Sequence, residues 1–282
     1  ITNAMKLVSS AKFNKAGKAV VGARPYRQAL DGLIKQLLQP DVEHPLLRVG
    51  HSDDAQSTKV LVLLFTSDRG LCGALNANML KYVEKTLRAE YGESFRTCVD
   101  FIAIGRKAQQ FCRKHKLNTI LEQSRVEQLD PLVWQRELLK IATEKFQAGV
   151  YDSVHLAFQW FVSGLKQVPS WQQFLPIDAA TLTADTDKSE DTDNEIYAGE
   201  MLLEPDRQQV IGQILSQHLA NQLFCALLNS LASEHCARMN AMDSATNNAK
   251  KVVKDLTLQY NRGRQAAITK ELIEITAGVQ AI

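Results

Sequence analysis

The chain has 282 residues, of which 45% are hydrophobic and 23% are charged, and its formal net charge is +2. This composition is typical of a soluble globular protein with a core of one or two domains. No apolar run approaches the roughly 18 residues that a membrane-spanning helix needs, so we expect any membrane association to go through partners.

The first predicted element is a helix over residues 1–38. Apolar and small residues recur there at helical spacing in two stripes. One stripe comprises Ile1, Ala4 or Met5, Val8, Ala11 and Ala19, and the other comprises Leu30, Leu33, Ile34 and Leu37. Pro25 lies between the two stripes. Because an interior proline removes a backbone hydrogen bond and costs about 3 kcal/mol, we expect a bend or a register change there and no break.

The N-terminal helix is basic, since residues 1–30 contain lysines and arginines but no acid. A mitochondrial transit peptide has the same character. We expect a helix of the mature protein instead, because this segment matches a second long helix at the other end of the chain.

A polar linker is predicted for residues 41–57. The continuous apolar run Lys59–Thr66 that follows has the length of a strand that is buried on both faces of a parallel sheet. Residues Ser67–Gly73 are predicted to form a turn, and the helix after this turn is expected to continue to about Tyr91.

A second strand is predicted over residues 95–105 and a third over residues 151–162. A helix to about Lys116 follows the second strand. Another helix is expected to begin at Asp130–Pro131, with the aspartate as N-cap and the proline at the first helical position, and to end at Gly149.

Two further strands are predicted near an edge of the sheet, over residues 171–177 and 195–203. The acidic tract 184–195 between them is interpreted as a solvated loop. Alternation of strands and helices predicts a parallel sheet with right-handed crossovers, which is a Rossmann-like α/β domain over residues 58–205.

The predicted sheet lacks the sequence signatures of a nucleotide site, because neither G-x-G-x-x-G nor the P-loop pattern occurs. Gly70 and Gly73 follow a strand and precede a helix, and we interpret them as a tight β–α turn. His115, His155 and His218 are each interpreted as structural or exposed. No Ser/His/Asp or Cys/His set is evident, and paired carboxylates occur only in the acidic loop. We therefore predict no catalytic residues.

The five cysteines are scattered and form no CxxC pair. They are Cys72, Cys98, Cys112, Cys225 and Cys236. We interpret them as buried free thiols, because a zinc site needs closely spaced Cys and His pairs. No metal site is predicted.

The last predicted element is a helix over residues 206–282, with Asp206 as its N-cap. Apolar or small residues alternate there in steps of three and four, as in a coiled-coil seam. They are Met242, Ala245, Ala249, Val252 and Leu256. At about 1.5 Å per residue this helix is roughly 115 Å long, so it must protrude from any compact domain and needs a partner along most of its run.

The predicted fold is therefore α/β plus a long antiparallel coiled coil, formed by the N- and C-terminal helices at residues 1–40 and 206–282. The Rossmann-like domain is inserted between these helices. Two function classes fit this pattern: a basic coiled coil that binds nucleic acid through phosphate contacts, and an enzyme built on the α/β domain. No nucleic-acid recognition motif is present.

Three stretches of the sequence resemble γ subunits of F-type ATP synthases. They are Ile1–Lys12 followed by Arg24–Tyr26, then Ser67–Asn76, and finally Ser233–Asp243 continuing into Leu256–Ile275. The last stretch is long and specific. The matching motifs cover about a third of the chain, and the similarity in architecture covers all of it.

The resemblance implies a central rotor shaft without an active site of its own. Its partners would be the α3β3 hexamer, the δ and ε rotor subunits and the c-ring, and no nucleic acid. The α/β domain would be the foot of the shaft, peripheral to the membrane through the c-ring. The chain would bind no cofactor, because ATP, ADP and Mg would be held by the α and β subunits. Rotation of the shaft would change the affinity of each β site in turn.

The resemblance also assigns roles to particular residues. Contacts between shaft and stator are implied for Met5, Arg238, Arg264, Gln265, Thr269 and Glu271. The apolar tip that turns in an upper bearing would include Ala277, Val279, Ala281 and Ile282. Arg69 and Cys72 would lie on a foot turn near β. Gly263 precedes the first of the distal contacts, and because an interior glycine costs about 1 kcal/mol we expect a softer helix there.

The resemblance favours the matrix side of the mitochondrial inner membrane, because residues 241–243 and 256–275 are more similar to mitochondrial than to bacterial γ subunits. The cytoplasmic side of a bacterial plasma membrane is the alternative. Redox control of the chloroplast type is not expected, because the region before the last helix is acidic and has no cysteine pair.

Overall fold

The computed structural model describes residues 1–37, 44–47, 59–125, 127, 130–177, 204 and 206–280, with side chains as far as residue 277. Most of the predicted linker 41–57, the acidic tract 184–195 and the predicted strand 195–203 lie outside the described residues.

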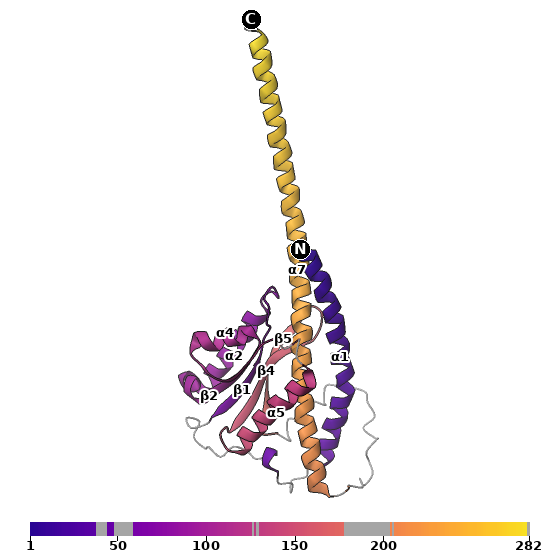
Figure 1. Cartoon of the computed structure of the whole chain (residues 1–282), viewed down its shortest axis with the longest axis vertical. Coiled ribbons are helices and arrows are strands. Elements are labelled where there is room, and N and C mark those ends of the chain that lie inside the picture. Colours follow the sequence, from indigo (N-terminus) through magenta and orange to yellow (C-terminus); the bar gives the residue numbers. More distant parts are fainter. Residues whose placement is uncertain are drawn as a thin grey trace.

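Two long helices, α1 (Thr2–Leu37) and α7 (Arg207–Gln280), run side by side in opposite directions (Figure 1). At one end Thr246 Oγ1 donates to Thr2 Oγ1 at 2.8 Å, and at the other end Arg207 Nη2 donates to the Leu37 carbonyl at 3.0 Å. The N-cap of α7 is the predicted one, because Gln209 N donates to Asp206 Oδ1 at 2.8 Å. The antiparallel pairing of the two terminal helices is confirmed.

The predicted contact face of α1 is wrong over its first half. Ile1 is fully exposed, Val8 is 58% exposed, and the alanines of that stripe are also exposed. The residues that face inward are Ser9, Phe13, Ala16, Val20 and Ala23, then Arg27, Leu30, Ile34 and Leu37. These residues alternate in steps of four and three without interruption, so Pro25 neither breaks the helix nor shifts its register. Small residues on this face let two backbones approach, and a search for apolar side chains overlooks such residues.

The predicted seam of α7 is buried only at its start. Met242 is 5% exposed and Ala245 is partly buried, but Ala249, Val252 and Leu256 are exposed. The reason is the length of α1, whose first residues lie beside Thr246. Within the described residues, α7 is therefore paired with α1 over its first half only. Its second half extends alone (Figure 1).

A five-stranded sheet lies beside the helix pair, in the order β3-β2-β1-β4-β5. Its strands are β1 (Val60–Phe65), β2 (Val99–Ile104), β3 (Asn118–Gln123), β4 (Ser153–Phe161) and β5 (Gln167–Leu175). The strands β1 to β4 are parallel, as expected, whereas β5 returns antiparallel along β4. The strand β3 was not predicted, because it is a half-exposed edge strand without strict alternation, and β5 begins four residues before its predicted start at residue 171.

Helices cover both faces of the sheet. They are α2 (Leu75–Tyr91), α4 (Arg106–His115) and α5 (Pro131–Gln147). Short helical segments occur at η1 (Pro45–Leu47), η2 (Gly92–Ser94) and α3 (Phe95–Cys98). The N-cap of α5 is confirmed, since Leu132 N donates to Asp130 Oδ1 at 3.0 Å. Residues 95–98 form a helical turn and not the start of the predicted second strand.

Two apolar cores lie on opposite faces of the sheet. The core on one face is filled from α2, α3 and α4. The core on the other face combines α5 with the end of α1 and with Ile211, Leu215, Leu219 and Leu223 of α7. The first half of α7 thus belongs to the core of the α/β domain, and packing crosses the predicted boundary at residue 206. We call the sheet with its covering helices α2 to α5 the foot. We call the two long helices α1 and α7 the shaft.

Candidate functional site

The contact between α7 and the foot changes character along the helix. Up to Leu227 the helix buries leucines in the apolar core. Beyond that residue apolar contacts continue at Leu228 and Leu231, and polar contacts join them. Asn229 Oδ1 accepts from Phe161 N at 3.3 Å, and Ser233 Oγ donates to the Gln159 carbonyl at 3.4 Å. Hydrogen bonds are directional, whereas apolar contacts are not, so the upper contact fixes orientation as well as distance.

The turn between β4 and β5 holds one side of α7. The Gly164 carbonyl accepts from Asn240 Nδ2 at 2.7 Å and from Cys236 Sγ at 3.1 Å. These two residues are four positions apart on the helix, so they share one face. One backbone carbonyl of the foot therefore binds two successive turns of α7.

The turn between β1 and α2 holds another side of α7 through Arg238, whose side chain is almost fully buried. Its Nη2 donates to the Arg69 carbonyl at 3.2 Å and its Nε donates to the Gly70 carbonyl at 3.3 Å. Its charge is balanced by Glu234, whose Oε1 lies 2.5 Å from Nη2. Burial raises the pKa of Glu234, and Arg238 opposes that shift.

The β1–α2 turn is held in shape by its own hydrogen bonds. Ser67 Oγ donates to the Arg69 carbonyl at 2.7 Å, while Asn76 Nδ2 donates to Ser67 Oγ at 2.6 Å and to Cys72 Sγ at 3.1 Å. Gly73 has φ of 61°, a backbone conformation that favours glycine. The interpretation of this stretch as a tight β–α turn is confirmed, and its carbonyls point at α7.

Glu127 connects the foot to both long helices. Its Oε1 lies 3.0 Å from His235 Nε2 on α7, and its Oε2 pairs with Lys12 Nζ on α1. The hydrogen bond with His235, followed by the bond with Lys12, lowers the pKa of Glu127 to about 2 despite partial burial. Glu127 is therefore an ionised link among three segments that are far apart in the sequence.

Two contacts between the long helices complete this region. Lys6 Nζ lies 2.6 Å from Asp243 Oδ1, and Thr246 binds Thr2 as described above. We call the polar residues of α7 between residues 229 and 246, with their partners in the foot and α1, the collar. Its members on α7 are Asn229, Ser233, Glu234, His235, Cys236, Arg238, Asn240, Asp243 and Thr246.

The structure brings three of the predicted site residues together. Met5, Arg69 and Arg238 line one cleft of about 400 Å³ beside the collar, with Glu127 and His235. The guanidinium of Arg238 is engaged inside the chain, whereas the side chain of Arg69 is exposed. Cys72 is buried and its sulfur faces Asn76, so this predicted site residue contributes to the turn and not to the surface.

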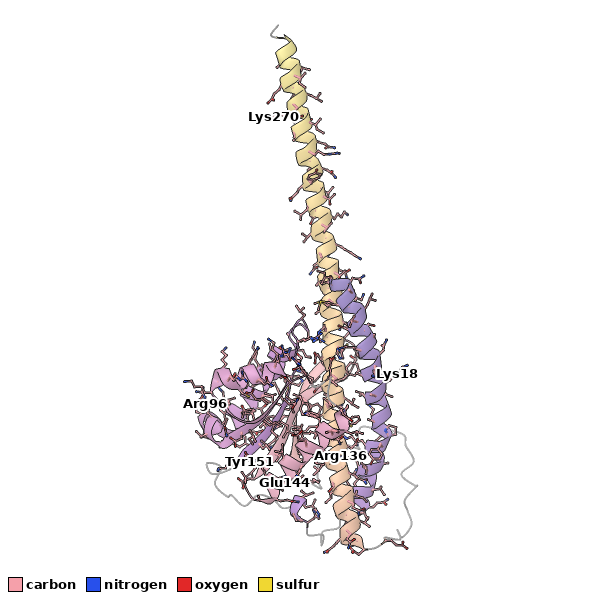
Figure 2. All side chains as sticks on the ribbon, viewed as in Figure 1. Lys18, Arg96, Arg136, Glu144, Tyr151 and Lys270 are labelled. Atoms are coloured by element: carbon pink, nitrogen blue, oxygen red, sulfur yellow. The ribbon has the colours of Figure 1, made fainter. Side chains whose placement is uncertain are left out.

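The other predicted site residues lie far from the collar, on the unpaired part of α7. Arg264, Gln265, Thr269 and Glu271 are all exposed. At about 1.5 Å per residue, Arg264 lies roughly 39 Å along the helix from Arg238. Figure 2 shows side chains, among them Lys270, projecting from this bare helix. Of the predicted bearing residues, Ala277 is exposed, and the side chains of Val279, Ala281 and Ile282 lie outside the described residues.

Three histidines outside the collar, His115, His155 and His218, lie in packed contacts. His155 is buried in β4, its ring stacks on Trp171 at 4.8 Å, and burial lowers its pKa to about 4. His218 is buried on α7 with Nδ1 3.1 Å from Asp31 Oδ1 of α1. His115 lies against the ring of Phe111. Each agrees with the interpretation of these histidines as structural or exposed.

The cysteines are all unpaired, and all but the partly exposed Cys98 are buried, so the interpretation as buried free thiols is confirmed for the other four. The described part of the chain contains no group of three or more His, Cys, Asp or Glu residues arranged to hold a metal ion. No described helix combines the length and the apolarity that crossing a bilayer requires.

A second cleft, of about 330 Å³, lies at the carboxyl ends of β1 and β2. Its charged lining residues are Asp68, Arg69, Arg106, Arg125, Glu127 and Glu234. Its acids Glu127 and Glu234 are already paired with Lys12 and Arg238 of the collar. The cleft therefore lies directly beside the collar, at the surface of the foot.

Sequence reasoning missed most of the collar. Glu127 lies in a loop without periodicity, and no catalytic or metal-binding motif in the sequence marks His235. The acceptors at residues 69, 70 and 164 are backbone carbonyls, for which no side chain gives a signal. The stretches Ile1–Lys12, Ser67–Asn76 and Ser233–Asp243 marked the region through the resemblance alone.

Comparison with known proteins gives one consistent result. The family model described as ATP synthase matches residues 1–282. ATP synthase gamma chains from Geobacter metallireducens and Anaeromyxobacter dehalogenans (strain 2CP-C) are 39% and 37% identical, over all of this chain and 93% of each relative. The gamma chain of Heliobacterium modesticaldum is 36% identical over the same shares.

Solved structures share the fold. A chain of the Tetrahymena thermophila mitochondrial ATP synthase central stalk and c-ring matches with a TM-score of 0.60 at 23% identity, covering 87% of this chain and 99% of that chain. A chain of the Euglena gracilis mitochondrial ATP synthase matches with a TM-score of 0.58 at 17% identity, covering 99% of this chain and 95% of that chain. At these identities the likeness concerns the fold alone.

Proposed function

Because this chain belongs to the ATP synthase family and is a γ chain, we propose that it works as the central rotor stalk of that enzyme. The observation that supports this function best is the full-length match together with a long helix that leaves an α/β foot and extends alone (Figure 1). Most of the stability of a helix in a protein comes from packing of its apolar side chains, so a bare helix of this length fits inside a ring of partners.

The proposed partners are those of a stalk. The exposed second half of α7 enters the α3β3 hexamer, and the foot rests with the δ and ε subunits on the c-ring. The two solved structures described above are of a central stalk with its c-ring and of an F1 and c-ring assembly, which supports these partners. The exposed apolar residues of the bare helix, such as Val253, Leu256 and Ile273, support burial against other chains.

The mechanism requires that the rotor present different faces to the three catalytic sites. As the c-ring turns the foot, α7 and α1 turn with it, and each β subunit meets different residues of the shaft. A site changes affinity only when these contacts differ between its states, which is the condition for coupling. The chain transmits torque, and the chemistry of ATP takes place elsewhere.

We assign no active site and no cofactor to this chain; ATP, ADP and Mg are bound by the α and β partners. The collar supports this assignment, because its charged residues are engaged in structural pairs. For the stator contacts we propose the exposed group Arg264, Gln265, Thr269 and Glu271, together with Met5 at the cleft beside the collar.

The location is proposed to be the cytoplasmic face of a bacterial plasma membrane, peripheral to it through the c-ring. The relatives at 36–39% identity that are named above are bacterial, which supports this choice. The matrix face of the mitochondrial inner membrane is the second candidate, favoured by the similarity of residues 256–275 to mitochondrial γ subunits. Mass spectrometry of the native complex decides between them through its subunit composition.

The function is tested by purifying the native complex through an affinity tag on this chain. We expect α and β subunits to copurify with c-ring subunits and the complex to hydrolyse ATP. A bead attached to the foot is expected to rotate during hydrolysis when the hexamer is fixed to a surface. Recovery of the chain without a hexameric ATPase would refute the proposal.

A further inference from the structure

The collar is the last place where the foot holds α7 before the helix extends alone. We propose that the collar is a torsional lock, which fixes the angle of α7 about its own axis relative to the foot when torque is applied. This inference rests on the rotor function proposed above. It assigns to Asn240, Arg238 and Glu127 a role in coupling rather than in folding alone.

The helical positions of the collar residues support a lock against rotation. Successive residues of an α-helix are about 100° apart around its axis. Cys236 and Asn240, which bind the Gly164 carbonyl, therefore share one side of α7. Arg238, which binds the Arg69 and Gly70 carbonyls, lies on roughly the opposite side. Two turns of the foot hold opposite sides of the helix, so rotation about its axis stretches both sets of bonds.

The apolar core below the collar complements this lock. Leu219, Leu223 and Leu227 hold α7 against the sheet, and such contacts resist separation and tilting. Apolar contacts have no preferred direction, and packed helices accommodate small sliding motions. Directional hydrogen bonds resist the small rotations that an apolar contact tolerates.

The position of the collar along the chain gives it this role. Residues 247–277 of α7 are exposed throughout, so torque exerted on them by partners reaches the foot through residues 229–246. Glu127 extends the lock to α1, because it binds Lys12 as well as His235. Lys6–Asp243 and Thr2–Thr246 join the two helices at the same level, so α1 and α7 turn together.

A reversible cross-link tests the lock in the assembled complex. The variant Gly164→Cys with Asn240→Cys removes the bond of 2.7 Å between Asn240 Nδ2 and the Gly164 carbonyl and places one thiol on each of the two residues that made it. A Cβ at residue 164 meets nothing within 4 Å, so the substitution leaves the turn intact. Cys236→Ala in the background prevents mispairing and also removes the second bond to the Gly164 carbonyl, so the reduced variant lacks this whole side of the collar. A short bismaleimide joins the thiols, because it can bridge the open space around a Cβ at residue 164, and mass spectrometry verifies the joined residues.

The expected result is a severalfold loss of proton pumping per ATP hydrolysed in the reduced variant, with recovery when residues 164 and 240 are joined. Asn248→Ala is the matched control, since this asparagine lies two turns further along the same helix and is exposed. It should pump as the unaltered complex does. A folding defect does not produce this pattern, because joining residues after assembly does not repair misfolded subunits.

Two outcomes would overturn the inference. Equal pumping by reduced and joined complexes would show that the collar carries no torque. Loss of turnover on joining would show that α7 must move against the foot. Either result leaves the rotor function standing if the complex assembles and rotates, whereas a chain that never joins an ATPase would refute the rotor function itself.

Discussion

Arg238 illustrates how a single residue acquires its role from its surroundings. The resemblance assigns it to the contact between shaft and stator. In the structure its guanidinium binds two carbonyls of the β1–α2 turn and the carboxylate of Glu234. Its planar fork of donors suits this arrangement, which a lysine cannot reproduce. The proposed contact with the stator could therefore reach this residue through the cleft that it lines beside Met5.

Arg238→Ala is expected to destabilise the chain by about 3 kcal/mol, because it leaves the buried carboxylate of Glu234 without its cation and removes the donor to the Gly70 carbonyl. The denaturation midpoint of the purified chain in urea measures the loss. Arg264→Ala, at an exposed position, serves as control and should stay within about 0.5 kcal/mol of the unaltered chain. Equal effects of the two changes would contradict the burial argument.

Glu127 makes stability depend on pH. Its pKa falls from an ordinary value of 4.5 to about 2 in the folded chain. A carboxyl group with a lowered pKa contributes stability that is fully present above 4.5 and is lost as the pH falls toward 2. We expect Glu127→Gln to lower the melting temperature at pH 7. We also expect the melting temperatures at pH 7 and pH 3 to differ less in this variant than in the unaltered chain. The same pH dependence in both proteins would show that this carboxylate contributes nothing to it.

At the scale of elements, α7 combines two structures in one continuous helix. Its first half is a core helix of the foot, and its second half is exposed on all sides. The hydrophobic pattern does not separate these halves, because apolar residues continue into the exposed part, as at Leu256 and Ile268. Such residues need partners that are other chains, in agreement with the rotor function.

The exposed residues of α7 from Arg264 to Glu271 are predicted to transmit torque without contributing to the stability of the chain. Arg264→Ala combined with Gln265→Ala should weaken ATP synthesis in membranes, because these exposed side chains are proposed to contact the stator. The stability of the purified chain should stay unchanged within about 0.5 kcal/mol. Comparing synthesis rate with denaturation midpoint checks both statements. Unchanged synthesis would remove this group from the proposed contacts.

At the scale of the whole molecule, the foot and the shaft share one core and one polar collar. The packing that joins them includes Ile34 and Leu37 from α1 and Ile211 and Leu215 from α7. A foot that contacted the two helices only loosely would rotate about their axis when torque is applied. The shared core and the collar make foot and shaft a single body up to the level of Thr246.

Met5→Lys tests the surface that this body presents to its partners. Met5 lines the cleft that also includes Lys12, Arg69 and Arg238, so a further cation there changes the local charge. We expect the complex to assemble and hydrolyse ATP while pumping fewer protons per ATP, since the change alters contacts rather than packing. Met5→Leu is the matched control. A normal ratio of pumping to hydrolysis in the lysine variant would contradict the prediction.

The sequence by itself determined the long C-terminal helix, the capped helix at Asp130, the parallel strands β1, β2 and β4, and the family. These features depend on local signals: periodicity, caps and runs of matching residues. The tertiary structure decided which face of α1 is buried, the antiparallel return of β5, and the collar. These depend on residues distant in the sequence, such as Arg238 and Gly70, and on backbone carbonyls. A carbonyl is the same at every position, so only the folded chain shows which ones meet a donor.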